Sequence, residues 1–326
     1  MTRVFAVTSA LTLGLAAFAA GAALGSGAGI ITEYAIPTAH ALSGGLAVGA
    51  DGNIWFTEGA GNKIAKITTG GVITEYAIPT GSSSPEDITA APDGNLWFTE
   101  SQADKIGKVS PRGTFTEYTL PVRGAWPYGI AAGADGNIWF TENRSNRIGR
   151  IAPNGAISEY AIPSAGANSS DITAGPDGSL WFSESSGPDP NESKIGKITT
   201  AGTITEYLLP AAGAEPVDLV AGPDGNLWFT ENDRNKIAKF NPKGTVTEYP
   251  IPTGNARPSG IAAGSDGNIW FNESRGNKIA KITPAGDVTE YKLPTAGAQP
   301  DGITAGPDGK LWFAENHGNK IGTISL

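Results

Sequence analysis

The dipeptide Trp-Phe occurs seven times in this chain at an almost constant interval. Its tryptophans are 42 residues apart, except for one interval of 47, and Glu always stands two residues after the Phe. A fixed period of this length indicates an array of supersecondary units, each of which buries its apolar face only against its neighbours. The tryptophans concerned are Trp55, Trp97, Trp139, Trp181, Trp228, Trp270 and Trp312.

One repeat contains four short segments with the composition of β-strands. In the second repeat these segments are ITAAP, NLWFTE, DKIGKV and TFTEYTLP, within residues 88–121, and turn residues separate them. Four strands in about 40 residues are typical of one blade of a β-propeller. We therefore predict an all-β, seven-bladed β-propeller. The Asp-Gly pair before each Trp-Phe segment is interpreted as a two-residue hairpin turn.

The two ends of the chain are predicted to close the ring. The motif Thr/Ser-Glu-Tyr marks the fourth strand of a repeat, and it also occurs seven times. Its first copy, at Thr32–Tyr34, precedes any Trp-Phe pair, whereas the last repeat ends at Leu326 without a copy. We expect residues 30–37 to pair with residues 320–325 and complete the last blade, which places the propeller domain at residues 29–326.

Residues 1–28 differ from the repeats and resemble a secretory signal. They contain one charge, Arg3, then an apolar run rich in Ala and Leu, then small residues. The predicted location is therefore extracellular or periplasmic, with no membrane attachment after cleavage. The alternative is an uncleaved membrane anchor, because the run from Val4 to Leu24 is long enough to span a bilayer.

Composition excludes one class of partner and says little about others. The formal net charge is −9, which argues against nucleic acid. Most of the acidic residues belong to motifs that recur in every repeat, so acidity by itself is weak evidence for a ligand. A monomer is expected.

The candidate binding site lies at the mouth formed by the loops that join successive blades. Residues just before and just after a recurrent Pro vary from repeat to repeat, and Trp126 with Tyr128 is predicted to form an aromatic platform there. The alternative is that Trp126 packs on its own loop. The Glu that ends each second strand, such as Glu58, is followed by a basic residue, such as Lys63. We interpret this pair as a tie between blades rather than as a ring of ligands for a divalent cation.

The recurring pattern Pro-x-Gly-Ile-x-x-Gly-x-Asp-Gly-x-Ile-Trp-Phe, followed by Asn-Lys/Arg-Ile and Glu-Tyr, resembles the virginiamycin B lyase (streptogramin B lyase) family. Residues 127–151 and 258–282 are examples of it up to the Asn-Lys/Arg-Ile segment, and the resemblance covers residues 30–326. It implies a seven-bladed propeller that uses Mg²⁺ to linearise a cyclic depsipeptide by elimination. In that reaction a His removes a proton while the metal polarises the adjacent carbonyl.

Position by position, the resemblance places the family's site in the last two blades. Ser259 and Asp301 stand where the family has histidines, Gln299 stands for a Glu, and Glu315 is retained. The implied catalytic positions are thus Ser259, Asp301 and Glu315, and the implied Mg²⁺ ligands are Gln299 and Glu315. Candidates for ligand binding are Trp126, Tyr128, Arg257 and His317, because they vary between repeats at the same mouth.

Three functions follow from these observations. The first is a secreted protein that binds a small molecule, peptide or glycan at the propeller mouth and lacks the family's catalytic histidines. The second is an elimination lyase that acts on a cyclic depsipeptide or a polysaccharide. The third is a cell-surface module for protein interaction.

Overall fold

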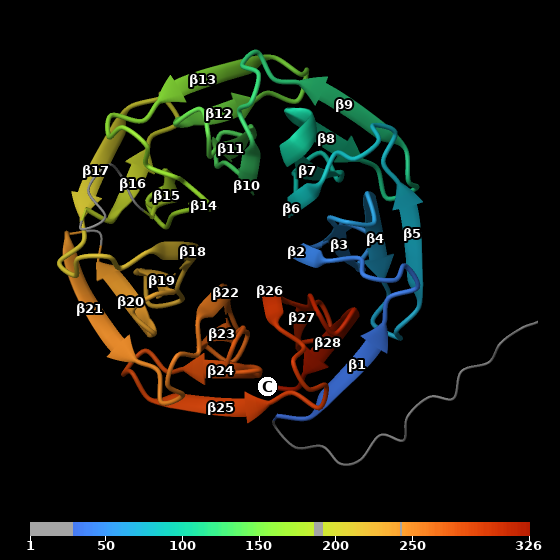
Figure 1. Ribbon diagram of the computed structural model, residues 1–326. Helices are drawn as coiled ribbons and strands as arrows, with labels where there is room; N and C mark the ends of the chain where they lie inside the picture. The colour runs from blue at the N-terminus through green and yellow to red at the C-terminus, as the bar shows by residue number, and fades with distance from the viewer. Residues whose placement is uncertain (1–28, 186–191, 242) are drawn as a thin grey trace, which may run out of the picture.

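Seven sheets of four antiparallel strands stand around a central axis (Figure 1). This computed structural model describes residues 29–185, 192–241 and 243–326. The predicted all-β, seven-bladed propeller is confirmed, whereas the proposed signal segment, residues 1–28, lies outside the described residues. Within the described ranges no helix is long and apolar enough to cross a membrane. A short 3-10 turn, η1 (Ser101–Ala103), follows one of the Trp-Phe strands.

Each blade runs from an inner strand on the channel to an outer strand on the rim. The inner strands are β2 (Ser43–Val48), β6 (Pro85–Ala90), β10 (Pro127–Ala132), β14 (Ile172–Ala174), β18 (Pro216–Ala221), β22 (Pro258–Ala263) and β26 (Pro300–Ala305). The second strands, with Trp-Phe, are β3 (Ile54–Glu58), β7 (Leu96–Glu100), β11 (Ile138–Glu142), β15 (Leu180–Glu184), β19 (Leu227–Glu231), β23 (Ile269–Glu273) and β27 (Leu311–Glu315). The third strands are β4 (Lys63–Ile67), β8 (Lys105–Val109), β12 (Arg147–Ile151), β16 (Lys194–Ile198), β20 (Lys236–Asn241), β24 (Lys278–Ile282) and β28 (Lys320–Ile324). The outer strands are β5 (Ile73–Ala77), β9 (Phe115–Thr119), β13 (Ile157–Ala161), β17 (Ile204–Leu208), β21 (Thr245–Pro250), β25 (Val288–Lys292) and β1 (Ile31–Ala35).

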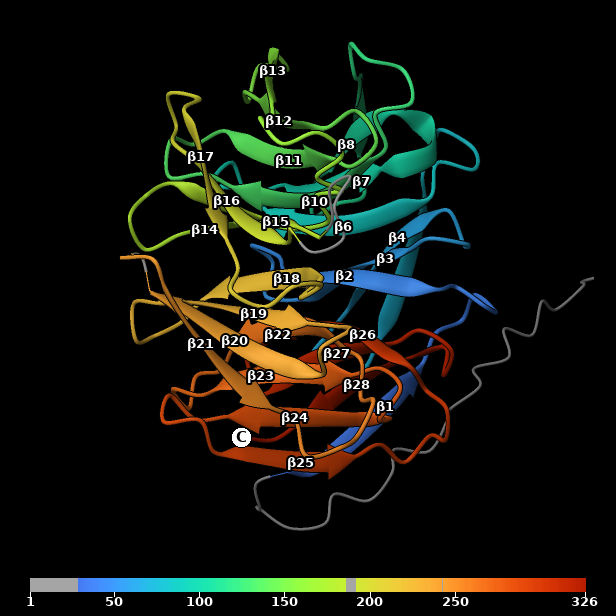
Figure 2. The same cartoon turned by 60° about the vertical axis from the view of Figure 1, so that its left-hand side comes forward.

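The first strand of the chain completes the last blade. β1 pairs with β28 in antiparallel register, with Ile31 opposite Ile324 and Ala35 opposite Lys320. The N–H of Gly29 extends this pairing by donating to the carbonyl of Ser325 at 2.8 Å. Figures 1 and 2 both show blue β1 beside red β28. The predicted closure of the ring is confirmed.

The Trp-Phe pair is apolar at both positions because its two side chains face different neighbouring blades. Trp55 shares a buried cluster with Phe98 of the next blade, whereas Phe56 shares one with Trp312 of the preceding blade. Side chains alternate between the two faces of a strand, so adjacent residues point to opposite neighbours. Within its own blade Trp55 stacks on Tyr76, with ring centroids 5.6 Å apart.

The Asp-Gly loop is longer than predicted, and its Asp has a second role. The loop between β2 and β3 spans residues 49–53, where the N–H of Gly52 donates to the carbonyl of Gly49 at 2.9 Å. Gly52 has a φ of +73°, whereas Asp51 is not in the left-handed region. The prediction of a two-residue turn was therefore wrong. The longer loop lets Asp51 Oδ1 turn back and accept the indole N–H of Trp55 at 3.0 Å.

One repeat lacks this hydrogen bond, and a methyl group explains the loss. Six repeats have Gly at the first position of the loop, and in each of them the indole donates to the Asp. The second repeat has Ala91 there, and the indole N–H of Trp97 is buried without a hydrogen-bond partner among the described residues. A Cβ added at Gly133 would lie 2.7 Å from the Trp139 ring and 2.5 Å from Asp135 Oδ1.

We expect Gly133→Ala to separate Trp139 from Asp135 and lower the free energy of unfolding by about 1–3 kcal/mol, because a buried donor loses its acceptor. Denaturant unfolding followed by tryptophan fluorescence measures this change. The reverse substitution, Ala91→Gly, is the control. It should restore the Trp97 hydrogen bond but gain less, because Gly in place of Ala adds conformational entropy to the unfolded chain, which costs about 0.4–1 kcal/mol. Unchanged stability of Gly133→Ala would contradict the assigned role of this Gly.

Candidate functional site

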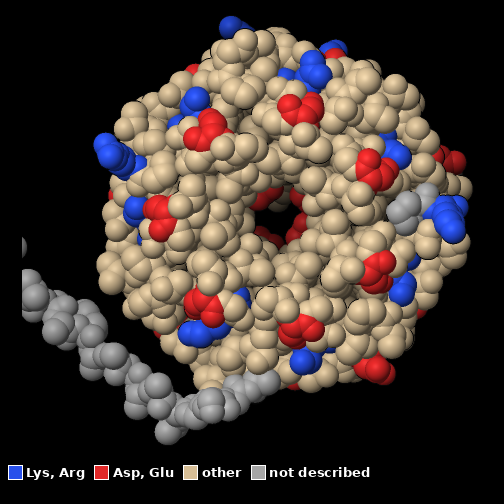
Figure 3. All heavy atoms as spheres, turned by 180° about the vertical axis from the view of Figure 1, so that it is seen from behind, with Lys and Arg blue, Asp and Glu red and all other residues tan. Residues whose placement is uncertain are grey.

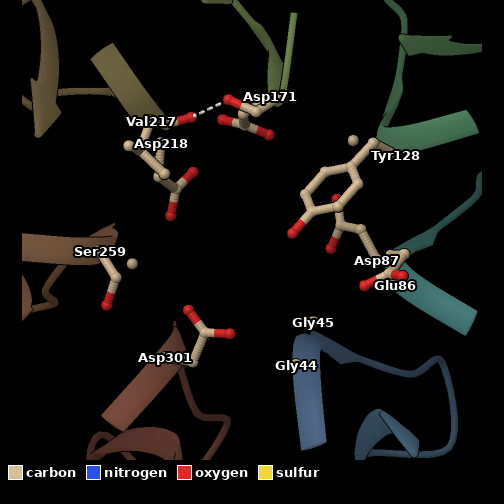
Figure 4. A pocket seen from close by; sticks show the side chains of 14 residues that line it. Gly44, Gly45, Glu86, Asp87, Tyr128, Asp171, Val217, Asp218, Ser259 and Asp301 are labelled. Carbon is tan, nitrogen blue, oxygen red and sulfur yellow. Dashed lines mark hydrogen bonds between the residues drawn. The ribbon is translucent and has the colours of Figure 1, made fainter. Parts of the chain in front are cut away.

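A bulge at the start of six of the seven inner strands, all except β14, directs side chains into the channel. In β10, Tyr128 and Gly129 together face Thr141 on the neighbouring strand. The Thr141 hydroxyl accepts the N–H of Gly129 at 2.9 Å. Bulges of this kind re-aim side chains near binding sites, and Figure 4 shows the Tyr128 side chain reaching toward the channel axis.

The loops that lead into the inner strands are held in one conformation. The Oδ1 of Asn62 accepts the N–H of Ser83 at 2.7 Å, and its Nδ2 donates to the carbonyl of Thr80 at 3.0 Å. In the loop before each inner strand, the residue that precedes a Pro (or Ser in the first and fourth blades) has a left-handed φ, although it is not glycine. This uncommon conformation is stabilised by such anchoring. The residues with this φ are Leu42, Ser84, Trp126, Asn168, Glu215, Arg257 and Gln299.

Carboxyl groups line the channel at this mouth. The cavity there has a volume of about 130 Å³, and its lining contains no Lys, Arg or His. Figure 3 shows acidic side chains inside the central opening as seen from the opposite face. The polar side chains around the cavity are those of Glu86, Asp87, Tyr128, Ser170, Asp171, Asp218, Ser259 and Asp301.

The aspartates among these groups have raised pKa values and hold protons more strongly than usual. Burial, followed by the charge of Asp171, raises the pKa of Asp87 to about 7. Burial and then the charge of Asp171 also raise the pKa of Asp218 well above its ordinary value. The N–H of Leu219 donates to both members of this pair, at 2.8 Å to Asp171 and 2.9 Å to Asp218. The wall of the channel is thus partly protonated near neutral pH, and it favours cations over anions.

A larger groove opens beside the channel at the same mouth. Its volume is about 480 Å³, within the range typical of small-molecule sites. Two large apolar side chains at its surface are unusually accessible: Leu42 is 44% exposed and Tyr128 is 38% exposed. The groove is lined by Leu42, Gly44, Gly59, Ala60, Asn62, Ser82, Ser84, Pro85, Glu86, Gln102, Tyr128, Asp301 and Asn316.

The three catalytic positions implied by the resemblance do not come together in one site. Asp301 lines both the channel and the groove, and burial and the charge of Glu86 raise its pKa. Ser259 is 8% exposed, and its hydroxyl donates to the carbonyl of Pro300 at 3.1 Å. Glu315 lines neither cavity and is fully buried inside its blade.

The donors expected for Mg²⁺ do not match the coordination that this ion prefers. Gln299 is an exposed neutral amide. Both carboxylate oxygens of Glu315 are buried without a hydrogen-bond partner among the described residues, but the same holds in five other blades. The described residues include no group of three or more His, Cys, Asp or Glu side chains that could hold a metal ion. Mg²⁺ prefers a nearly octahedral set of oxygens. The residues present do not fit this ion.

The glutamates that end the second strands are not ring ligands around the channel, and their predicted ion pairs were assigned to the wrong partner. Glu58 is fully buried, and Lys63 pairs instead with Glu75 of the outer strand at 2.6 Å. The N–H of Thr38, in the loop that enters this blade, donates to the other oxygen of Glu75 at 2.9 Å. The ion pair therefore lies within one blade, and Glu75 rather than Glu58 ties this blade to the loop that leaves the preceding one, through the hydrogen bond from Thr38.

The other predicted binding residues lie around the rim of the mouth. The Trp126 ring lies 3.7 Å from the guanidinium carbon of Arg144, so it packs on a residue of its own blade. Arg257 pairs with Asp233 at 3.2 Å. His317 is exposed, and its backbone N–H donates to the carbonyl of Ala298.

Sequence reasoning missed the channel carboxylates. Their position, the second after the recurrent Pro (Ser in the first and fourth repeats), is Gly in four repeats and Asp in three. The sequence therefore showed a difference between repeats with and without a carboxyl group at this position. The missed residues are Asp87, Asp171 and Asp218. Asn316, which follows Glu315 and lines the groove in its place, was also missed.

Comparison with known proteins gives one family and a set of solved structures. The model described as "Virginiamycin B lyase family" matches residues 23–189 and 172–326. A streptogramin B lyase structure is 41% identical, with a TM-score of 0.86, covering 91% of this chain and 97% of its own. A virginiamycin B lyase from Staphylococcus aureus is 40% identical, with a TM-score of 0.85, covering 91% of this chain and 99% of its own. A catalytically inactive histidine-to-alanine variant of the latter, with quinupristin, matches equally well.

More distant likenesses concern the fold alone. Hydrazine synthase from Kuenenia stuttgartiensis has a TM-score of 0.73 at 16% identity. No match was found among the curated protein sequences compared.

Proposed function

The chain belongs to the virginiamycin B lyase family, and we propose that it is a secreted member that binds a ligand without the family's elimination chemistry. The ligand is a small molecule, peptide or glycan, and it is held at the mouth of the channel. The apolar and small-residue composition of residues 1–28 supports an extracellular or periplasmic location.

The observation that carries this proposal is the lining of the mouth. Neither the channel cavity nor the groove beside it has a His in its lining. An elimination needs a base that faces the substrate, with a pKa near the working pH. Ser259 is buried and bonded to a backbone carbonyl, so it supplies no such base. A roomy, preformed groove that is lined by both polar and apolar side chains suits binding.

The alternative is a lyase in which Asp301 replaces the missing His. Two observations favour it: the 41% identity with a streptogramin B lyase, and the raised pKa of Asp301. A carboxylate with a raised pKa is a stronger base than an ordinary one, and Asp301 faces both cavities. The two candidates therefore differ in whether Asp301 removes a proton from a bound ligand.

Incubation with a streptogramin B antibiotic and Mg²⁺ distinguishes the two candidates. We expect the antibiotic to be recovered intact, as judged by liquid chromatography and fragmentation mass spectrometry, because elimination leaves the mass unchanged while it opens the ring. A catalytically active streptogramin B lyase serves as the positive control. Ring-opened product that disappears in Asp301→Asn would overturn our proposal and assign Asp301 as the base.

A further inference from the structure

The wall of the groove has a gap where one blade presents no side chain. In the first blade the two residues after the inner-strand start are Gly44 and Gly45, whereas the corresponding positions in the flanking blades carry Asp301 and Glu86. Figure 4 shows Gly44 and Gly45 between these two carboxyl groups. The gap is thus a slot with a backbone floor and an acidic group on either side.

Glu86 is held in place at the edge of this slot. Its Oε1 accepts hydrogen bonds from the hydroxyls of Ser84 at 3.2 Å and Ser101 at 2.9 Å. Asn316 adds an acceptor at the other side, because its Oδ1 is buried without a hydrogen-bond partner among the described residues. The slot therefore offers oriented oxygen acceptors, which suit a ligand that has several N–H donors.

The charge around the slot has one sign. The lining of the groove includes Glu86 and Asp301 but no Lys, Arg or His. The charge of Glu86 is one of the causes that raise the pKa of Asp301, after burial. A bound cation would relieve this repulsion, whereas an anion would increase it.

The groove also contains accessible apolar surface. Leu42 and Tyr128, both accessible, line the same cavity as the two carboxyl groups. Large accessible apolar side chains within a concave site mark contact area for a ligand. An aromatic ring beside acidic groups also attracts a positive charge to its face.

We propose that this groove binds amphiphilic amines: a protonated amine lies in the Gly44 slot between Glu86 and Asp301, and an aromatic or branched apolar group packs on Leu42 and Tyr128. This inference rests on the proposed function and names the chemical class of its ligand. The proposal distinguishes amines from neutral sugars and from carboxylates without an amine, which offer no cation to the slot.

Ligand-observed NMR titration with 2-phenylethylamine tests the proposal, with 2-phenylethanol and 3-phenylpropionate as neutral and anionic analogues of similar shape. We expect the amine to bind at least about tenfold more tightly than either analogue. Glu86→Gln should weaken amine binding about tenfold or more, because it removes one charge of the slot. Gly44→Val should abolish binding, since it fills the slot with the residue that Val217 provides in the fifth blade.

Two controls separate binding from folding. Glu215→Gln removes a carboxylate on another side of the mouth, outside the groove, and should leave amine binding unchanged. Thermal unfolding checks that Gly44→Val folds, because a Cβ at Gly44 would lie 3.1 Å from the carbonyl oxygen of Glu86. If Gly44→Val fails to fold, the amine affinity of Glu86→Gln is the test of the proposal.

Equal affinity for the three probes, or an unchanged affinity of Glu86→Gln, would overturn the amine assignment and leave the proposed function standing. Failure of all three probes would also overturn it. The proposed function fails separately, when ring-opened antibiotic forms in the lyase assay.

Discussion

A chain that begins at Thr38, and so lacks β1, is expected to lose about 5 kcal/mol or more of unfolding free energy, which is comparable to the whole stability of many domains. Removing β1 exposes β28 as an unpaired edge. It also removes the Tyr34 ring from Trp312, whose ring centroids are 5.9 Å apart. Lys320 loses its ion pair with Glu33 at 2.6 Å. Guanidinium unfolding and size-exclusion chromatography should show a loose or aggregated chain.

A permuted chain provides the control for this truncation. It begins at Thr38 and carries residues 29–37 after Leu326, with one added residue between them. The linker then has the length of the β4–β5 loop, residues 68–72. This chain should recover most of the lost stability, because β1 again pairs with β28 while the order of strands in space is unchanged. Equal stability of the truncated and intact chains would show that closure through β1 contributes nothing.

The fold could be predicted because the same residue types recur at equivalent positions of every repeat. Trp55 and Phe56 are both apolar since each faces a different neighbouring blade, and the residue pattern shows this directly. The early position of Glu33 and Tyr34 relative to the first Trp-Phe pair was enough to predict the closure. Loop length was harder, because Asp-Gly suits two kinds of turn, and only the packing of Asp51 on Trp55 selects the longer one.

The site could be predicted only as a region. The varying residues before and after the Pro do form the mouth, and Asp301 and Tyr128 do line it. The bulge that aims these side chains inward, and the left-handed φ of Leu42, depend on tertiary hydrogen bonds that leave no mark in a single sequence. Glu315 shows the limit, because a carboxylate at a strand end suggests exposure, yet the loop above it buries it completely.

Folded stability is expected to fall between about pH 5 and pH 8, because seven buried carboxyl groups have raised pKa values. In each blade the Glu that ends the second strand is 0–2% exposed. Burial, followed for Glu100 by the charge of Glu117, raises the pKa of Glu100 to about 7. The equivalent Glu184 and Glu315 reach about 8. Their ordinary pKa is 4.5, so the unfolded chain releases these protons first.

The direction of the effect follows from proton linkage. A group with a raised pKa in the folded state stabilises the fold fully below its unfolded pKa, and this contribution is lost as pH rises through the folded pKa. Stability is therefore lost over a pH range that begins near the ordinary pKa of 4.5 and ends near the folded-state pKa values of about 7–8. The carboxylates with lowered pKa values, such as Asp51 at about 2, change their protonation and affect stability only at lower pH. The melting temperature should thus be higher at pH 5.5 than at pH 8.5.

A pair of variants in the second blade assigns the effect to its source. Glu100→Gln should stabilise the protein by about 1–3 kcal/mol at pH 8.5, with a small change at pH 5.5, since each pKa unit corresponds to about 1.4 kcal/mol. Glu117→Gln, the control, should destabilise it at both pH values. That change leaves Lys105 without its ion pair and the N–H of Thr80 with a weaker acceptor. If Glu100→Gln had the same effect at both pH values, Glu100 would be ionised in the folded protein throughout, and the buried carboxyl groups would not be the origin of the pH dependence.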